Sequence, residues 1–210
     1  MAFLLRVELP DVPGSLGALA SSIGAAGANI EAIEIVEHVA DGTAIDDVML
    51  DLPTGVLPDM VISACQKLEG IRVLWISRYT AGTSLTMDLE AVEALTAEPP
   101  AALSILVDLV PQTFRCDWAA LVEGGSVVGT TSAAPDLDDR VLGGWLPLGK
   151  AKRLEPPAAD QAWSTMELAG VPAGPGKVVL VGRRGGPEIL DSELARLAHL
   201  AALAASVSEG

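Results

Sequence analysis

The sequence is poor in aromatic residues, which make up only 3% of its 210 residues, although half of all residues are hydrophobic. Any core must therefore be built mainly from Leu, Val, Ile and Ala. The high hydrophobic fraction excludes an intrinsically disordered chain, because disorder requires low hydrophobicity together with high net charge. A chain of this length predicts one large domain or two small ones.

Cysteine is also scarce, since Cys65 and Cys116 are the only two in the chain. Two cysteines are too few for a disulfide framework or for a zinc site made of cysteines alone. The two histidines, His38 and His199, form no local ligand pair with them or with each other. We therefore predict no metal site, no cofactor and reduced thiols.

Basic residues are few, because 13 Lys and Arg stand against 28 Asp and Glu, for a formal net charge of −15. Such an acidic chain repels phosphate backbones and anionic lipids, so nucleic acid and membrane surfaces are excluded as expected partners. The acidic residues are spread along the chain and form no tail. The acidity therefore marks no particular site.

A long apolar run is missing as well. Arg6, Glu8 and Asp11 interrupt the N-terminus before a signal segment can form. The longest uncharged stretch, residues 12–30, contains Pro13 and four glycines, which makes it a poor membrane span. The expected location is the cytoplasm.

The first eighty residues predict the element order βαββαβ. Alternation of apolar and polar residues indicates half-buried strands, apolar residues three and four apart indicate helices, and Asp41-Gly42 predicts a hairpin turn. Ser15 is the predicted N-cap of the first helix and Gly27 its predicted end. The predicted strands cover about residues 3–9, 30–38, 43–52 and 71–75, and the predicted helices about residues 15–27 and 57–68. The expected fold is a ferredoxin-like α+β domain with both helices on one face of an antiparallel sheet, and with strands one and three in its centre.

Two motifs in this half resemble the ACT domain, a regulatory family. Its first loop reads D/N-x-P-G-x-L, matched here by Asp11-Val12-Pro13-Gly14-Ser15-Leu16. Its first helix ends in G-x-N-I, matched by Gly27-Ala28-Asn29-Ile30. By this resemblance, residues 1–80 are identified as an ACT regulatory domain.

The resemblance implies that a small amino acid binds between two such domains paired side by side in a homodimer. By motif position, Asp11 and Asn29 bond the ligand's amino and side-chain groups, and the amides around Gly14 and Ser15 receive its carboxylate. Helix N-termini present unpaired N–H groups and partial positive charge, which agrees with this role. The remaining residues of the predicted ligand site are Val12, Pro13, Leu16 and Ile30.

Structural interpretations of the same residues stay open. Residues 11–14 also make a good turn, and Asn29 is suited to a left-handed position after the helix. Many ACT-like domains only dimerise. His38 at a strand end is expected to be a solvated edge residue, and Cys65 is expected in the core.

Residues 81–84 are small and polar and predict a linker, and residues 85–210 predict a second α+β domain with an antiparallel sheet and flanking helices. Pro111 is expected to end its second helix, Gly124-Gly125 to turn a hairpin, and Asp191 to cap its last helix. The predicted helices lie at about residues 85–98, 103–110, 138–145 and from 191 onward, and the predicted strands at about 118–123, 126–131, 161–168 and 177–182. Residues 170–176 are predicted as a loop.

This second half is similar to a GAF domain. The similarity is carried by Trp118–Val122 with its hairpin, by the segment Val178–Pro187, and by the helix Leu190–Leu197. The chain lacks the pocket Cys-His of bilin-binding GAF proteins, the several cysteines of those that reduce methionine sulfoxide, and the N-K-x-F-D-E of cyclic-nucleotide binders. These three specialised roles are therefore disfavoured.

Two features of this half have more than one interpretation. Gly182-Arg183-Arg184-Gly185-Gly186 is either a solvated loop or a cradle for an anion, because it joins two guanidinium groups to flexible backbone. Trp145 and Trp163 either line an apolar pocket or belong to the core. The segment Gly174–Lys177 suggests a phosphate loop, but Val171 and Val178 stand where that motif needs Gly and Ser or Thr.

The sequence holds no recognisable catalytic constellation. His38 and His199 fall in different predicted domains, and neither a G-x-S-x-G nor a G-x-G-x-x-G motif is present. We therefore predict a non-catalytic regulatory protein, not an enzyme: an amino-acid sensor whose effector lies at an ACT dimer interface and which acts on an unidentified protein partner. Two alternatives remain, an assembly module that dimerises without a small ligand and an enzyme with its site in the C-terminal domain.

Overall fold

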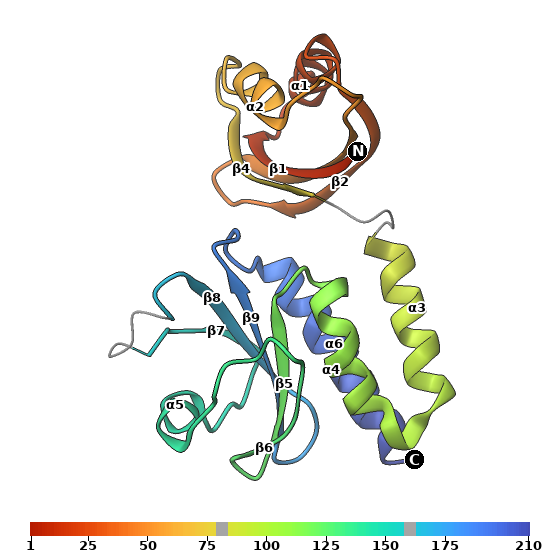
Figure 1. Ribbon diagram of the computed structural model, residues 1–210, viewed down its shortest axis with the longest axis vertical. Helices are drawn as coiled ribbons and strands as arrows, with labels where there is room; N and C mark the ends of the chain where they lie inside the picture. Colours follow the sequence, from red (N-terminus) through yellow and green to blue (C-terminus); the bar gives the residue numbers. More distant parts are fainter. Residues whose placement is uncertain (79–83, 158–162) are drawn as a thin grey trace. The chain divides into compact units, whose positions relative to one another are not determined.

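The computed structural model describes residues 1–78, 84–157 and 163–210, and it divides into two compact units, Met1–Ala81 and Gly82–Gly210 (Figure 1). Of the predicted linker, residues 81–83 lie outside the described residues, and Ser84 is the first residue of a helix.

The first unit has the predicted element order βαββαβ and a four-stranded antiparallel sheet ordered β2-β3-β1-β4. The central strands are therefore β1 and β3, as predicted, and β2 lies at an edge. Figure 1 shows both helices on one face of this sheet. The elements are β1 (Ala2–Pro10), α1 (Ser15–Ala25), β2 (Asn29–His38), β3 (Thr43–Asp51), α2 (Pro58–Cys65) and β4 (Arg72–Arg78).

The core of this unit lies between the sheet and its two helices. Alternate residues of the central strands face the helices, because side chains on a strand alternate between its two faces. The sheet contributes Leu5, Val7, Leu9, Val48 and Leu50 to this core, and the helices contribute Leu19, Ile23, Val61 and Cys65. The expected core position of Cys65 is confirmed.

The other face of β1 carries Arg6. Arg6 is accommodated because Asp47 of β3 accepts hydrogen bonds from its Nε at 2.7 Å and from its Nη2 at 2.9 Å. A bidentate pair of this kind satisfies both charges, and such satisfaction is what makes the burial of two ions tolerable.

Helix boundaries in this unit differ from the predicted ones in two places. Gly14, not Ser15, is the N-cap of α1, with φ of 100°. That left-handed conformation suits glycine, which lacks the Cβ that would clash there. The second helix ends at Cys65 rather than near Leu68, and turns follow it up to Gly70.

The second unit is also α+β, with one antiparallel five-stranded sheet ordered β6-β5-β9-β8-β7. Helices α4 and α6 cover one face of this sheet and α5 lies on the other side (Figure 1). The elements are α3 (Ser84–Ala97), the 3-10 turn Pro99–Ala101, α4 (Ala102–Thr113), β5 (Trp118–Glu123), β6 (Ser126–Thr130), α5 (Asp139–Trp145), β7 (Lys152–Leu154), β8 (Met166–Pro172), β9 (Lys177–Arg184) and α6 (Asp191–Ser208).

Each face of this sheet has its own core. The aliphatic core lies under α4 and α6, and the core beneath α5 contains Trp118, Trp145 and Trp163. The ring of Trp163 meets those of Trp118 and Trp145 edge to face, with centroids 6.3 and 5.6 Å apart. Of the two interpretations of Trp145 and Trp163, the structure therefore supports the core, and Trp145 in addition borders a cavity described below.

Four local predictions for this unit are wrong. Pro111 does not end α4, which continues for two more residues to Thr113. The helix continues because its buried face, including Leu106 and Val110, packs in the core. The short strand β7 lies outside all the predicted strands. Residues 170–172, expected to be loop, belong to β8. Leu190, not Asp191, precedes α6 as its cap.

No single helix among the described residues is long and apolar enough to cross a membrane. The bent pair Thr86–Ala97 and Pro99–Thr113 reaches the required length and composition only when both helices are counted together.

Candidate functional site

The first loop of the N-terminal unit joins the end of β1 to the start of α1. Asp11, Val12, Pro13 and Gly14 are exposed, and so is Leu16 of the first helical turn. Gly14 has no side chain with which to cap the helix. The first N–H groups of a helix lack intrahelical acceptors, and that of Ser15 donates instead to the carbonyl of Val12 in the loop at 3.2 Å. The start of α1 therefore offers partial positive charge and the remaining N–H groups of its first turn next to this loop.

Asp11 forms a side-chain hydrogen bond with His38, the last residue of β2. Their Oδ2 and Nδ1 atoms are 3.0 Å apart, and both side chains are more than half exposed. The backbone N–H of Asp11 donates to the carbonyl of Gly42 at 2.9 Å, which ties the loop to the β2–β3 turn. His38 is thus solvated, as predicted. Its hydrogen bond with Asp11 was not predicted from the sequence.

A buried carboxylate lies at the same end of the sheet. Asp46 is only 2% exposed, and it stands opposite Val7 in β3–β1 pairing, which places it on the helix-covered face. Its Oδ1 atom has no hydrogen-bond partner among the described residues. Burial raises the pKa of Asp46, the charge of His38 lowers it, and the charges of Asp11 and Asp47 raise it further. This residue was missed at the sequence level, although its alternation with Val48 and Leu50 does predict an inward position.

Asn29 and Ile30 lie at the opposite end of the sheet from Asp11. Asn29 is exposed and pairs with Asp51 in the sheet, while Ile30 packs on the core. Asn29 begins β2 and His38 ends it, so nine residue steps, about 30 Å of extended strand, separate Asn29 from the Asp11–His38 pair. One protomer therefore does not bring the two predicted ligand-binding residues together.

The left-handed interpretation of Asn29 is wrong. Gly27 takes the left-handed conformation after α1, with φ of 87°. Arg115 is the one non-glycine residue with positive φ in the described parts of the chain. Asn29 is instead an ordinary strand residue, and its side chain is free of that backbone role.

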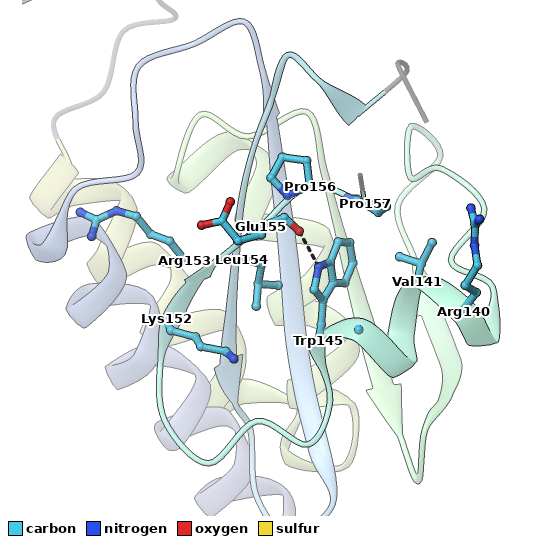
Figure 2. Close-up of a pocket in the computed structure, with 10 residues that line it drawn as sticks. Arg140, Val141, Trp145, Lys152, Arg153, Leu154, Glu155, Pro156 and Pro157 are labelled. Atoms are coloured by element: carbon cyan, nitrogen blue, oxygen red, sulfur yellow. Dashed lines mark hydrogen bonds between the residues drawn. The ribbon is translucent and has the colours of Figure 1, made fainter. Parts of the chain in front are cut away.

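The C-terminal unit has a cavity of about 470 Å³ between α5 and the segment that follows β7 (Figure 2). Trp145 forms one wall, and its Nε1 donates to the carbonyl of Glu155 at 2.8 Å. Arg153 is engaged with Glu188 at 2.9 Å and Asp191 at 2.7 Å. The residues that line the cavity are Arg140, Val141, Gly144, Trp145, Lys152, Arg153, Leu154, Glu155, Pro156 and Pro157. The described lining combines apolar walls with cationic side chains and the carboxylate of Glu155.

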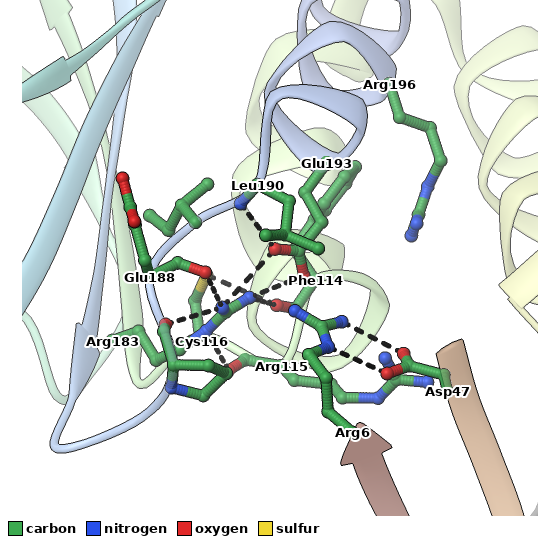
Figure 3. Close-up of polar contacts among 12 residues, drawn as sticks. Arg6, Asp47, Phe114, Arg115, Cys116, Arg183, Glu188, Leu190, Glu193 and Arg196 are labelled. Atoms are coloured by element: carbon green, nitrogen blue, oxygen red, sulfur yellow. Dashed lines mark hydrogen bonds and ion pairs between the residues drawn. The ribbon is translucent and has the colours of Figure 1, made fainter. Parts of the chain in front are cut away.

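The proposed anion cradle at residues 182–186 is wrong, because one of its two arginines is committed elsewhere. Arg183 is 4% exposed and donates to the carbonyls of Phe114 at 2.7 Å and Pro187 at 3.0 Å, and to Glu193 Oε1 at 2.9 Å (Figure 3). Arg184 alone is exposed. The solvated-loop interpretation is therefore also wrong for Arg183, which is a structural residue.

Neither a protein-family model nor a curated protein sequence matches the chain. Among solved structures, the chain is similar to a GAF domain of an Acinetobacter phosphoenolpyruvate-protein phosphotransferase, at 13% identity and a TM-score of 0.46, covering 62% of this chain and 95% of that one. It is also similar to a free methionine-R-sulfoxide reductase from Neisseria meningitidis, at 14% identity and a TM-score of 0.45, over 63% of this chain and 94% of that one. A formyltetrahydrofolate deformylase from Pseudomonas putida KT2440 is matched at 11% identity and a TM-score of 0.33, over 100% of this chain and 94% of that one. At these values no functional residue is transferred, and the resemblance of residues 1–80 to the ACT domain stays a prediction.

Proposed function

We propose that the protein is a non-catalytic regulatory protein that binds a small amino acid between two copies of its N-terminal unit and acts on a partner protein. The observation that carries the proposal is the separation of Asp11 and Asn29 by the whole length of an edge strand. Each end of β2 holds half of a plausible site, and a second copy is what can unite the halves.

The sheet order makes this union feasible. Strand β2 lies at the sheet edge, where its outer N–H and C=O groups are open to pairing. Antiparallel pairing of β2 with β2 of a second copy, related by a two-fold axis, brings the start of one strand next to the end of the other. Asn29 of the partner subunit then lies near Asp11, His38 and the start of α1.

The groups gathered in this way suit a zwitterion. The amide donors and partial positive charge at the start of α1 favour a carboxylate. Asp11 offers the opposite charge for an ammonium group. Asn29 of the partner subunit adds a side-chain amide that both donates and accepts hydrogen bonds.

A second candidate function is assembly without a small ligand, through the same strand. Ile35 on β2 is 52% exposed, and an apolar side chain on an open edge favours pairing with another chain. The two functions share the dimer and differ in whether an amino acid changes its stability.

Thermal unfolding in the presence of each of the 20 amino acids separates the two candidates. A ligand present at 100 times its Kd adds about 2.7 kcal/mol to stability. An amino acid that raises the midpoint supports the sensor, whereas a midpoint unmoved by all 20, in a protein that is dimeric, supports assembly alone.

A mixing experiment tests whether the site is shared. Asp11→Ala and Asn29→Ala are each expected to abolish the shift, while Asp59→Ala, the same kind of change at an exposed position on α2, leaves it intact. After subunit exchange, a mixture of the two variants regains about a quarter of the sites, because each mixed dimer has one complete site. Two inactive variants whose mixture stays inactive would show that Asp11 and Asn29 do not belong to one shared site.

A further inference from the structure

Two neighbouring aspartates on β3 are buried in different ways. Asp47 is fully paired, since both of its oxygens accept hydrogen bonds from the buried Arg6. Asp46 is 2% exposed, yet its Oδ1 has no hydrogen-bond partner among the described residues. A buried carboxylate oxygen without a hydrogen-bond partner lowers the stability of a fold, and β3 has such an oxygen at Asp46 but not at Asp47.

The place of Asp46 connects it with the candidate site. Val7 and Ile35 are its neighbours on the two flanking strands, and Val7 belongs to the core with Leu19 and Ile23 of α1. Asp46 thus lies on the face that α1 covers, and on β3 it is two residues from Ala44, the partner of His38. The charges of His38 and Asp11 both act on its carboxyl group.

A buried acceptor, an exposed carboxylate and a helix N-terminus therefore occupy one end of the N-terminal sheet. The exposed Asp11–His38 hydrogen bond is the easily broken contact in this group, because water competes for both side chains. A ligand ammonium has three N–H donors, enough to bond Asp11 and a second carboxylate at once.

We propose that Asp46 anchors the cationic group of the ligand, whose ammonium displaces His38 from Asp11 and donates to the unpartnered Oδ1 of Asp46. This rests on the proposed function and deepens it by naming the ligand class. The ligand carries a free ammonium group, so N-acylated amino acids and plain carboxylic acids are excluded. The unpartnered Oδ1 lowers the stability of the ligand-free protein and gains a hydrogen bond when the site is filled.

The first test uses the ligand-free protein, with Asp46→Asn and the matched variant Asp47→Asn compared by thermal unfolding at neutral pH. Asp46→Asn keeps the shape of the side chain and removes its charge, so the unfolding midpoint is expected to rise. Asp47→Asn breaks the buried pair with Arg6, so its midpoint is expected to fall. A lower midpoint for Asp46→Asn would show that Asp46 has a structural partner role, and the anchor would be wrong.

The second test measures binding of the 20 amino acids, and of the N-acetyl form of each one that binds, to the wild type and to Asp46→Asn. Loss of a charge-assisted hydrogen bond is expected to weaken binding to the variant about tenfold or more, and the N-acetyl form is expected not to bind the wild type. Equal affinity of one amino acid for both proteins would overturn the anchor and leave the proposed function standing. Absence of binding of any amino acid to the wild type would overturn the proposed function, and the anchor with it.

Discussion

Arg183 on β9 and Glu193 on α6 form a buried ion pair, in which Nη2 lies 2.9 Å from Oε1. The other oxygen of Glu193 accepts the backbone N–H of Leu190 at 2.9 Å, at the start of α6. Arg183 in turn donates to carbonyls near the end of α4, at Phe114. The pair therefore joins the last strand, the last helix and the end of α4 in the C-terminal unit.

Replacing Arg183 by Met is expected to lower the free energy of unfolding by about 3–5 kcal/mol, because it removes the charge partner of the buried Glu193 carboxylate and a donor to backbone carbonyls. Chemical denaturation monitored by circular dichroism measures this loss. The matched change Arg184→Met, at an exposed side chain of the next residue, is expected to stay within about 0.5 kcal/mol of the wild type. A small effect at Arg183 would mean that water replaces its partners at little cost.

Gly14 and Gly17 are expected to respond to alanine in opposite directions. Gly14 has a φ of 100°, which costs an L-residue about 1–2 kcal/mol, so Gly14→Ala should lower stability by about that amount. Gly17 lies inside α1 and has open space where a Cβ would stand, so Gly17→Ala should raise stability by about 0.4–1 kcal/mol. The two variants are compared by thermal and denaturant unfolding. A stabilising Gly14→Ala would show that the first loop easily adopts another conformation.

Local patterns predicted most of the elements, because each strand and helix of the N-terminal unit repeats its apolar residues at its own period. The predictions were wrong where contacts between distant segments determine the secondary structure. The three residues of β7 are too few to show a period, and they become a strand by pairing with β8. Pro111 remains helical because the packed face of α4 outweighs the loss of one hydrogen bond.

The candidate site was predictable only in the part that lies in one short segment. The loop from Asp11 to Leu16 is recognisable as a motif, whereas its contact with His38 joins residues 27 apart and depends on strand register. The alternation of β3 predicts that Asp46 points inward, but the local sequence does not show whether a buried carboxylate has a hydrogen-bond partner. Asp47 has such a partner in Arg6, whereas the Oδ1 of Asp46 has none among the described residues. Pairing across strands is a property of the folded sheet.

The two cysteines are expected to be unreactive in the folded protein. Burial raises the pKa of the Cys116 thiol to about 12 and also raises that of Cys65, so little thiolate is present at pH 8. An aromatic disulfide reagent at pH 8 should react slowly with the native chain and rapidly with both thiols after denaturation. Ser126→Cys, at the exposed start of β6, serves as the reactive control. Rapid reaction of Cys116 in a Cys65→Ser background would contradict the raised pKa of this partly buried thiol.

The stability difference between Asp46→Asn and the wild type is expected to depend on pH. Burial first, and then the charges of Asp11 and Asp47, raise the pKa of Asp46 in the folded state above its ordinary value of 3.8, and His38 opposes them. A carboxyl group with a raised folded-state pKa binds more protons folded than unfolded, so the wild type loses stability as pH rises from the ordinary value through the raised one. The variant lacks this group, so its advantage should be smallest below about pH 3.8, grow across that window and level off above it. Denaturant unfolding of both proteins from pH 3 to pH 8 measures the difference, in which titrations common to both proteins cancel. An advantage that is constant over this range, or that shrinks as pH rises, would mean that the carboxyl group of Asp46 is satisfied in the folded protein.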